Sequence, residues 1–300
     1  LELPVPRAGA EAVEQEERGA VPGGLAVEVG VGQAEHGHGG LLYAPPQFDT
    51  TLPTGLRMAA PLRAVLWDFD GTLADTRRRN FLVVRRMLTE VMGREPDHIE
   101  GLESPEVYDR LNRRFRNWRQ MYDEVFGLSE DETDRVGSLW TRYQLEDATP
   151  SPVFDGVANV LAGLGFVPHG IVSMNGRDQI VRSLRDANLH EAFGSIVGWE
   201  EVHIRRQKPE PDGLLSCLGR LTSADDGIAL YIGDHETDAR CARNANEVLA
   251  ARGTGLRIVS IAAHFTGVMD ESAWEVLPDH AARRPDDVLD IARDLLDGQG

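Results

Sequence analysis

The sequence is poor in cysteine, in long apolar runs and in positive charge, and each shortage excludes a class of protein. Only Cys217 and Cys241 occur among 300 residues, so we expect no disulfide framework and predict a reducing, cytoplasmic setting. No apolar stretch approaches the roughly 20 residues that a membrane-spanning helix needs. The 49 acidic residues outnumber the 31 basic ones, and this excess argues against non-specific binding to nucleic acid. We therefore expect a soluble globular protein of one large or two modest domains.

Residues 1–57 differ in composition from the rest of the chain. They are rich in Gly, Ala, Glu and Pro, their apolar residues follow no sustained period, and we expect them to be disordered or loosely packed. They show no basic region followed by an apolar block, so no secretory signal is predicted. Because the first Met is Met58, two interpretations stay open: a genuine flexible extension, or an artefactual one upstream of the true start. His36 and His38 are not interpreted as a metal site, since Gly-rich surroundings fix no ligand geometry.

Beyond this segment the apolar residues follow regular periods. The run over 64–69 has the composition of a parallel strand that is buried on both faces. After a Pro-rich linker over 149–152, strands and helices of similar length alternate, which is typical of βαβ units and a parallel sheet. The further expected strands are 169–173, 195–199, 228–232 and 257–262, and the expected helices are 156–164, 178–187, 211–221, 237–246 and 286–296.

A block of three predicted helices over 76–147 interrupts this alternation directly after the first strand. A C-cap at Gly93, an N-cap at Ser104 and a capping box that begins at Ser129 mark the helix ends. The second of the three helices is expected to follow one apolar stripe as far as Val125.

These patterns predict an α/β fold, namely a Rossmann-like doubly wound parallel sheet with an inserted all-helical cap domain. We place the α/β core at 58–75 and 152–300 and the helical cap at 76–151. An insertion at this point would overhang the carboxyl edge of the sheet, where open α/β sheets bind their ligands.

Four segments at or after the ends of predicted strands carry side chains suited to chemistry. Taken singly, each has an ordinary structural explanation, such as turn formation, a surface lysine or helix capping. Their placement at one edge of one sheet favours a common site. Two carboxylates in the first segment are costly to hold together unless positive charge lies between them. The segments are Asp68-Phe69-Asp70-Gly71-Thr72, Ser173-Met174-Asn175, Lys208, and Asp234 with Asp238.

In this order the four segments resemble the motifs of the haloacid dehalogenase superfamily. The resemblance covers residues 62–297 and fits the phosphoglycolate phosphatase-like branch, whose C1-type helical cap is inserted after the first motif. The sequence departs from the family pattern at Met174, where many relatives have a small polar residue, so the role of Asn175 stays open. His235, inside the fourth motif, could touch substrate or metal, but the interpretation that we favour is a turn residue that points to solvent.

The resemblance implies a Mg²⁺-dependent phosphomonoesterase that acts on a small phosphorylated metabolite through an aspartyl-phosphate. Asp68 would be the nucleophile, and Asp70 would protonate the leaving alkoxide and then activate the water. Lys208 would neutralise Asp68 and a phosphoryl oxygen. The remaining implied roles are metal ligation by Asp68, by the backbone carbonyl of Asp70 and by Asp234, orientation of these groups by Asp238, and phosphate binding by Gly71, Thr72, Ser173, Met174 and Asn175.

Asp at position 70 narrows the reaction class. Dehalogenases of the superfamily lack this residue and cation-pumping relatives carry Thr, so Asp70 favours a phosphatase or, as the alternative, a phosphomutase that acts on a sugar phosphate. A catalytically idle binding protein on the same fold is the third interpretation. No residue of the sequence names the substrate or the oligomeric state.

The arginines of the cap are interpreted mainly as a solvated face, because acidic residues are interspersed among them. One or two could read a second anionic group of the substrate, and Arg77 and Asn80 are among those closest in sequence to the catalytic edge. The arginines concerned are Arg77, Arg78, Arg79, Arg85 and Arg86 on the first helix, and Arg110, Arg113, Arg114, Arg116 and Arg119 on the second.

Overall fold

The computed structural model describes residues 60–115, 118–267, 271 and 274–298. The expectations for residues 1–57, including both interpretations of Met58, lie outside the described residues. Contacts divide the chain into two units, residues 1–53 and 54–300, and every described residue belongs to the second unit. No helix in the described part of the chain combines the length and the apolar character that crossing a membrane requires.

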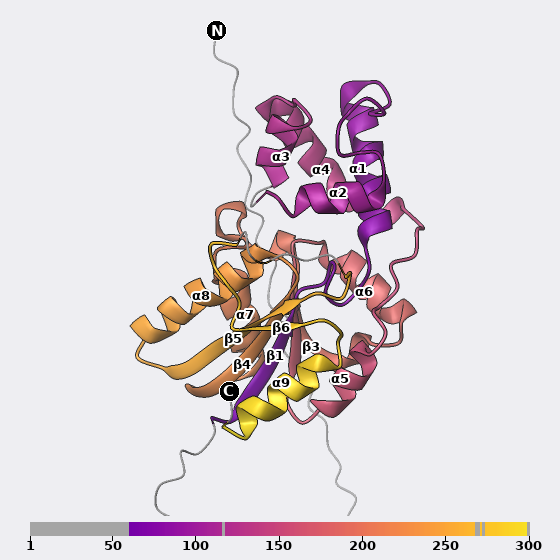
Figure 1. Cartoon of the computed structure of the whole chain (residues 1–300). Helices are drawn as coiled ribbons and strands as arrows, with labels where there is room; N and C mark the ends of the chain where they lie inside the picture. The colour runs from indigo at the N-terminus through magenta and orange to yellow at the C-terminus, as the bar shows by residue number, and fades with distance from the viewer. Residues whose placement is uncertain (1–59, 116–117, 268–270, 272–273, 299–300) are drawn as a thin grey trace, which may run out of the picture. The chain divides into compact units, whose positions relative to one another are not determined.

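One parallel sheet of six strands forms the centre of the described residues (Figure 1). The strand order is β3-β2-β1-β4-β5-β6, so the first strand lies inside the sheet. The sixth strand escaped the sequence analysis because three residues are too few to show an alternating pattern. The strands are β1 (Leu62–Trp67), β2 (His169–Val172), β3 (Phe193–Val197), β4 (Asp226–Gly233), β5 (Gly255–Ala263) and β6 (His280–Ala282).

Helices cover both faces of this sheet, which confirms the doubly wound α/β class. Val65 and Trp67 of β1 pack into the cluster formed with α5, α6 and α9, whereas Ala64 and Leu66 pack into the cluster formed with α7 and α8. This alternation follows from the period of two along a strand. The helices are α5 (Val157–Gly163), α6 (Arg177–Asp186), α7 (Asp212–Leu221), α8 (Glu236–Ala251) and α9 (Asp287–Leu296), with short 3₁₀ turns η1 (His190–Ala192), η2 (Trp199–Glu201) and η3 (Ile204–Arg206).

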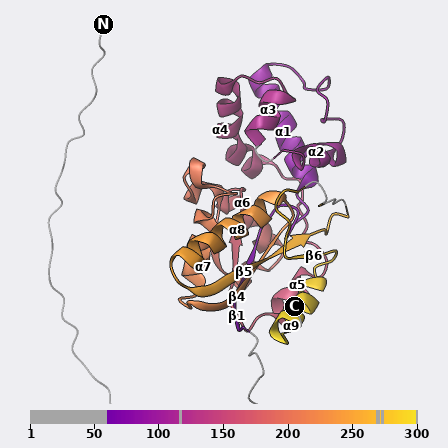
Figure 2. The same cartoon turned by 60° about the vertical axis from the view of Figure 1, so that its left-hand side comes forward.

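Four helices between β1 and α5 enclose a hydrophobic cluster of their own, in which Met87, Leu88 and Met121 are among the most buried side chains. Figures 1 and 2 show them grouped beyond one end of the sheet. The predicted caps at Gly93, Ser104 and Ser129 are present. The helices are α1 (Arg77–Met92), α2 (Pro105–Asn112), α3 (Trp118–Glu124) and α4 (Glu130–Glu146).

The prediction of a single second helix as far as Val125 is wrong, because α2 and α3 are separate helices. At the end of α2 the backbone N–H groups of Arg114 and Phe115 bond to carbonyls three residues back, as in a tightening final turn. Both helices contribute to the same hydrophobic cluster. One apolar stripe therefore runs through both helices, and the sequence pattern did not indicate the break between them.

The two chain segments that join the four helices to the sheet lie side by side. The Asp75 N–H donates to the Pro152 carbonyl at 2.8 Å, and the Phe154 N–H donates to the Leu73 carbonyl at 3.0 Å. These hydrogen bonds tie the exit from the first motif to the return of the chain into the core. The four helices are thus joined to the core by two adjacent connecting segments, the first of which starts next to Asp68 and Asp70.

Candidate active site

Lys208 is itself one of the four segments singled out in the sequence, and it contacts two of the others. Its Nζ donates to Asp68 Oδ1 at 2.5 Å and to Asp238 Oδ1 at 2.7 Å, and its side chain is only 5% exposed. Asp68 directly follows β1, and its N–H continues the ladder by donating to the Ile232 carbonyl of β4. Parallel strands end at one edge of the sheet, and this topology brings residues 140 positions apart into one ion-paired cluster.

Asp68 lies in an environment that disfavours its ionised form. Burial raises the pKa of Asp68 well above its ordinary value, Lys208 lowers it, and three neighbouring carboxylates raise it further. Burial alone would lower the pKa of Lys208, but Asp238 and Asp68 outweigh that effect and raise it. A further cation beside the carboxylates would favour the ionised form of Asp68.

Asp238 is fixed by three donors. Besides Lys208, the Tyr231 hydroxyl donates to its Oδ1 at 2.8 Å, and the His235 N–H donates to its Oδ2 at 3.1 Å. Gly233 makes room for this carboxylate, because a Cβ there would lie 2.3 Å from Asp238 Cγ. These contacts suit the orienting role that the resemblance implied for Asp238.

Asp234 faces the first motif from the end of β4. At Gly71 the backbone has a φ of +73°, and a Cβ there would lie 2.2 Å from Asp234 Oδ2, so both strain and space require glycine. The Gly71 N–H donates to the Ala74 carbonyl at 2.9 Å. The structure therefore gives Gly71 a steric role beside Asp234.

Carboxylate oxygens of Asp68, Asp234 and Asp238 lie within 4.8 Å of one another, and all three residues are buried. Three buried acidic groups this close together could hold a metal ion. The ligand atoms are all oxygen, which suits a hard divalent cation such as Mg²⁺ better than zinc or copper.

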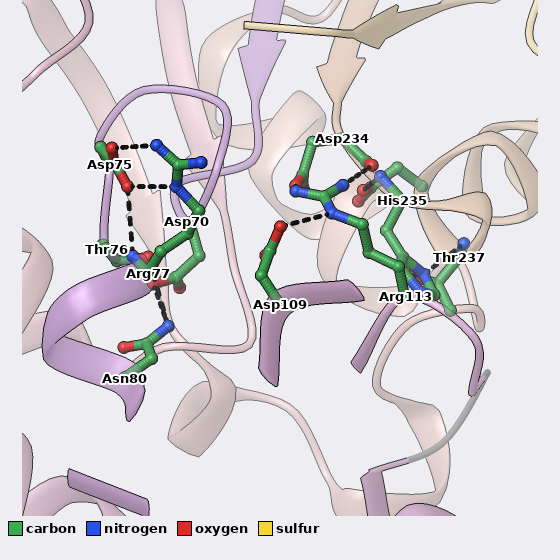
Figure 3. A network of polar contacts seen from close by, with 11 residues as sticks. Asp70, Asp75, Thr76, Arg77, Asn80, Asp109, Arg113, Asp234, His235 and Thr237 are labelled. Atoms are coloured by element: carbon green, nitrogen blue, oxygen red, sulfur yellow. Dashed lines mark hydrogen bonds and ion pairs between the residues drawn. The ribbon is translucent and has the colours of Figure 1, made fainter. Parts of the chain in front are cut away.

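Asp70 is held by amides from two different parts of the chain. Asn80 Nδ2 on α1 and Asn175 Nδ2 after β2 both donate to Asp70 Oδ1, at 3.1 and 3.2 Å (Figure 3 shows Asn80 and Asp70). Asn80 Oδ1 in turn accepts from Gln144 Nε2 on α4 at 2.8 Å. Asn175, whose role the sequence left open, thus contacts Asp70 directly.

The hydroxyls predicted to bind phosphate lie in the same region. Ser173 Oγ is buried and accepts from the Asn175 N–H at 3.1 Å. Thr72 is fully buried, and its Oγ1 has no hydrogen-bond partner in the structure. A buried hydroxyl without a partner is uncommon and marks a place where a ligand oxygen could bind. Met174 follows Ser173 and is half-buried.

The structure defines the surroundings of two further polar residues near the site. Arg77 is paired with Asp75, with nitrogen–oxygen distances of 2.8 and 2.6 Å, so in this structure its charge is already engaged (Figure 3). His235 does not project into solvent: it is the half-buried N-cap of α8, and its Nδ1 accepts from the Thr237 N–H.

The sequence analysis did not single out Arg113, which reaches the site from the end of α2. Its Nη2 lies 2.6 Å from Asp234 Oδ2, and its Nη1 donates to the Asp234 backbone carbonyl at 2.7 Å. Thirteen arginines occur between residues 76 and 151, and no local pattern distinguishes the one that folding brings to Asp234.

The carboxyl of Asp234 leads us to expect that the stability of the metal-free protein changes with pH. Burial raises its pKa from 3.8 to about 6, although Arg113 opposes the shift. The folded protein then binds this proton more tightly than the unfolded chain. The resulting stability is present below pH 3.8 and is lost as the pH rises through about 6.

Between pH 4 and pH 7 we therefore expect the melting temperature of Asp234→Asn, measured in EDTA, to rise by roughly 5 °C relative to that of the wild type. Circular dichroism melts of both proteins across this range measure the difference. A difference that does not change with pH would contradict the assigned shift.

Comparison with known proteins agrees with this geometry. The family model described as haloacid dehalogenase-like hydrolase matches residues 65–251. Pyrophosphatase PpaX of Listeria monocytogenes serotype 4a (strain HCC23) is 26% identical over 246 residues, which cover 80% of this chain and 97% of that protein. N-acetylmuramic acid 6-phosphate phosphatase of Pseudomonas putida is 30% identical over 198 residues, 63% of this chain and 82% of that protein.

Solved structures show the same fold. A predicted phosphoglycolate phosphatase from Haemophilus somnus 129pt aligns with a TM-score of 0.57 at 16% identity, covering 77% of this chain and 98% of its own. A haloacid dehalogenase-like family hydrolase from Streptococcus pneumoniae aligns with a TM-score of 0.54 at 19% identity, covering 77% and 98%. The sheet edge, its buried acidic cluster and these matches lead to one conclusion: the chain belongs to the haloacid dehalogenase-like hydrolases, and the curated relatives named here are phosphatases.

Proposed function

We propose that this chain is a Mg²⁺-dependent phosphomonoesterase that hydrolyses a small phosphorylated metabolite through an aspartyl-phosphate on Asp68. The observation that carries the proposal is the 2.5 Å ion pair between Lys208 Nζ and Asp68 Oδ1. A phosphomonoester is dianionic and repels a carboxylate nucleophile, so catalysis depends on neutralising charge and aligning the two groups. Lys208 supplies one positive charge at the oxygen that would attack.

The remaining positive charge would come from Mg²⁺. Asp68, Asp234 and the backbone carbonyl of Asp70 are the oxygen ligands proposed for it, with Asp238 orienting Lys208 and the ligand shell. When bound, the ion would polarise the phosphoryl oxygens and neutralise charge on them.

Two proton transfers by Asp70 complete the proposed reaction. Asp68 forms a bond to phosphorus as the ester P–O bond breaks, and protonated Asp70 gives its proton to the leaving alkoxide. Asp70 then takes a proton from water, which attacks the aspartyl-phosphate and releases free phosphate and Asp68. The amides of Asn80 and Asn175 hold Asp70 by one oxygen throughout, so the other oxygen can exchange the proton.

The buried hydroxyls of Thr72 and Ser173 are proposed to bind the phosphoryl oxygens that Lys208 does not reach. Curated relatives act on pyrophosphate and on N-acetylmuramic acid 6-phosphate, according to their names. Both are small anionic phosphate compounds, and both belong in the first set of substrates to be tested.

The test is a phosphate-release assay over these two compounds, hexose phosphates, phosphoglycolate and p-nitrophenyl phosphate. We expect release with Mg²⁺, loss of at least tenfold in EDTA, and recovery when Mg²⁺ is restored. Chromatography of the hexose phosphate reactions should show free sugar rather than an isomerised sugar phosphate. Isomerisation without phosphate release would identify a phosphomutase, and no turnover of any compound with Mg²⁺ would contradict catalysis.

A further inference from the structure

A buried ion pair links the helical block to the proposed metal ligand Asp234. The guanidinium of Arg113 contacts this residue twice, through the side-chain oxygen Oδ2 at 2.6 Å and through the backbone carbonyl at 2.7 Å. The side chains of Arg113 and Asp234 are 15% and 12% exposed, so water screens their interaction weakly. Figure 3 shows Arg113 pointing from its helix toward the end of β4, with Asp109 on its other side.

We propose that Arg113 is a counter-ion, delivered by the helical block, that opposes Mg²⁺ at Asp234. In the metal-free protein Arg113 balances the Asp234 carboxylate and latches the block over the site. Metal entry weakens this latch, and the latch in turn weakens metal binding. The inference rests on the proposed function only in taking Asp234 as a ligand of Mg²⁺.

The sign of this coupling follows from charge. Five carboxylates lie in or beside the site, namely Asp68, Asp70, Asp109, Asp234 and Asp238, whereas Lys208 and Arg113 each carry one positive charge. A divalent cation on the Asp234 carboxylate would lie within a few ångströms of the guanidinium that holds the same carboxylate. Like charges at such a separation repel strongly where water is excluded. Removing the guanidinium must therefore strengthen cation binding.

Asp109 lowers the free-energy cost of breaking the contact between Arg113 and Asp234. It lies four residues before Arg113 on the same helical segment, and its Oδ2 is 3.0 Å from Arg113 Nε. When Asp234 is given up, Arg113 keeps this partner and is not left as an unpaired charge. Arg113 thus has two arrangements, one in which it holds both Asp109 and Asp234 and one in which it keeps Asp109 and releases Asp234. Such a choice is what coupling between two sites requires.

The test is the affinity of the resting protein for Mg²⁺, measured by isothermal titration calorimetry without substrate. We expect Arg113→Met to bind Mg²⁺ about fivefold more tightly or better than the wild type, as typical couplings between sites predict. Arg110→Met is the matched control, since it removes an exposed charge from α2 three residues away, and its affinity should stay within about twofold of wild type.

A second measurement reports on the contact between Arg113 and Asp234 itself. Hydrogen exchange measured by mass spectrometry should show that Mg²⁺ increases exchange at the end of α2 in the wild type, with no such increase in Arg113→Met. Unchanged or weaker Mg²⁺ binding by Arg113→Met, or faster exchange in both proteins, would overturn the coupling. Asp234→Asn separates the two proposals: if this variant binds Mg²⁺ as well as the wild type, the metal site proposed at Asp234 is wrong, whatever Arg113 does.

Discussion

Replacing Asp68 by Asn will abolish phosphate release and leave the fold intact. The amide has nearly the shape of the carboxylate but is too weak a nucleophile to form the phosphoenzyme, so we expect kcat/KM to fall by roughly 10³-fold or more. The assay is phosphate release from the best substrate, with circular dichroism to check the fold.

The same substitution should stabilise the metal-free protein. Burial raises the pKa of Asp68, which means that its ionised form is disfavoured in the folded state at neutral pH. Asn removes one of several like charges while Lys208 keeps Asp238 as a partner. We expect the melting temperature of Asp68→Asn in EDTA to equal or exceed that of the wild type.

Asp70→Asn is the informative contrast, because it keeps the nucleophile and removes the proton transfers. With an activated aryl phosphate, whose leaving group needs no proton, this variant should form the phosphoenzyme and hydrolyse it slowly. Asp68→Asn should form none, as intact-mass spectrometry after acid quenching would show. Wild-type turnover by Asp68→Asn, or a phosphoenzyme in that variant, would refute Asp68 as the nucleophile.

The sheet and its acidic edge could be predicted because both depend on local signals. A strand buried on both faces is apolar throughout, and the residues that follow it lie at the carboxyl edge whatever the rest of the chain does. Asp68 and Asp234 were therefore recognisable from sequence. Lys208 follows no strand directly, and only the order of the motifs indicated that it would meet Asp68.

Contacts between the helical block and the core could not be predicted, because they depend on how separate helices are placed in space. Asn80 was noted for its position in the chain, but its bond to Asp70 and its link to Gln144 require the packing of α1 against α4. Arg113 lies among many arginines with the same local pattern. Its role depends on where α2 ends, and the apolar stripe did not show that point.

Lys208 is the only lysine of the chain; the other 30 basic residues are arginines. Every other basic position carries arginine, so the exception marks a place where a compact ammonium group is needed. Between Asp68 and Asp238, a single nitrogen reaches both carboxylates at 2.5 and 2.7 Å. A planar guanidinium spreads its charge over a wider fork and does not fit the same position equivalently.

We expect Lys208→Met to inactivate the enzyme and to destabilise it by roughly 3–5 kcal/mol, since it leaves two buried carboxylates without this cation. Urea unfolding in EDTA measures the loss of stability. Adding Asp68→Asn to Lys208→Met should restore part of that stability, because it removes one of the two carboxylates that are left without the cation. Compared with Lys208→Met, Lys208→Arg should restore more of the stability than of the activity. A loss that Asp68→Asn does not relieve would show that the two residues are not coupled.

The single lysine also allows its charge to be observed directly. Asp238 and Asp68 outweigh burial and raise the pKa of Lys208 above 10.5, so the folded state holds this proton more tightly than the unfolded chain. The stability gained is fully present at neutral pH and is lost only as the pH rises through the folded-state pKa. Protein labelled with ¹³C at lysine Cε should give one side-chain signal, and in the metal-free wild type that signal should not titrate below pH 10.5. In Asp68→Asn its titration should move to lower pH, because one of the two carboxylates that hold the proton is gone. A signal that titrates near neutral pH in the wild type would mean that Lys208 is uncharged when the nucleophile needs its charge.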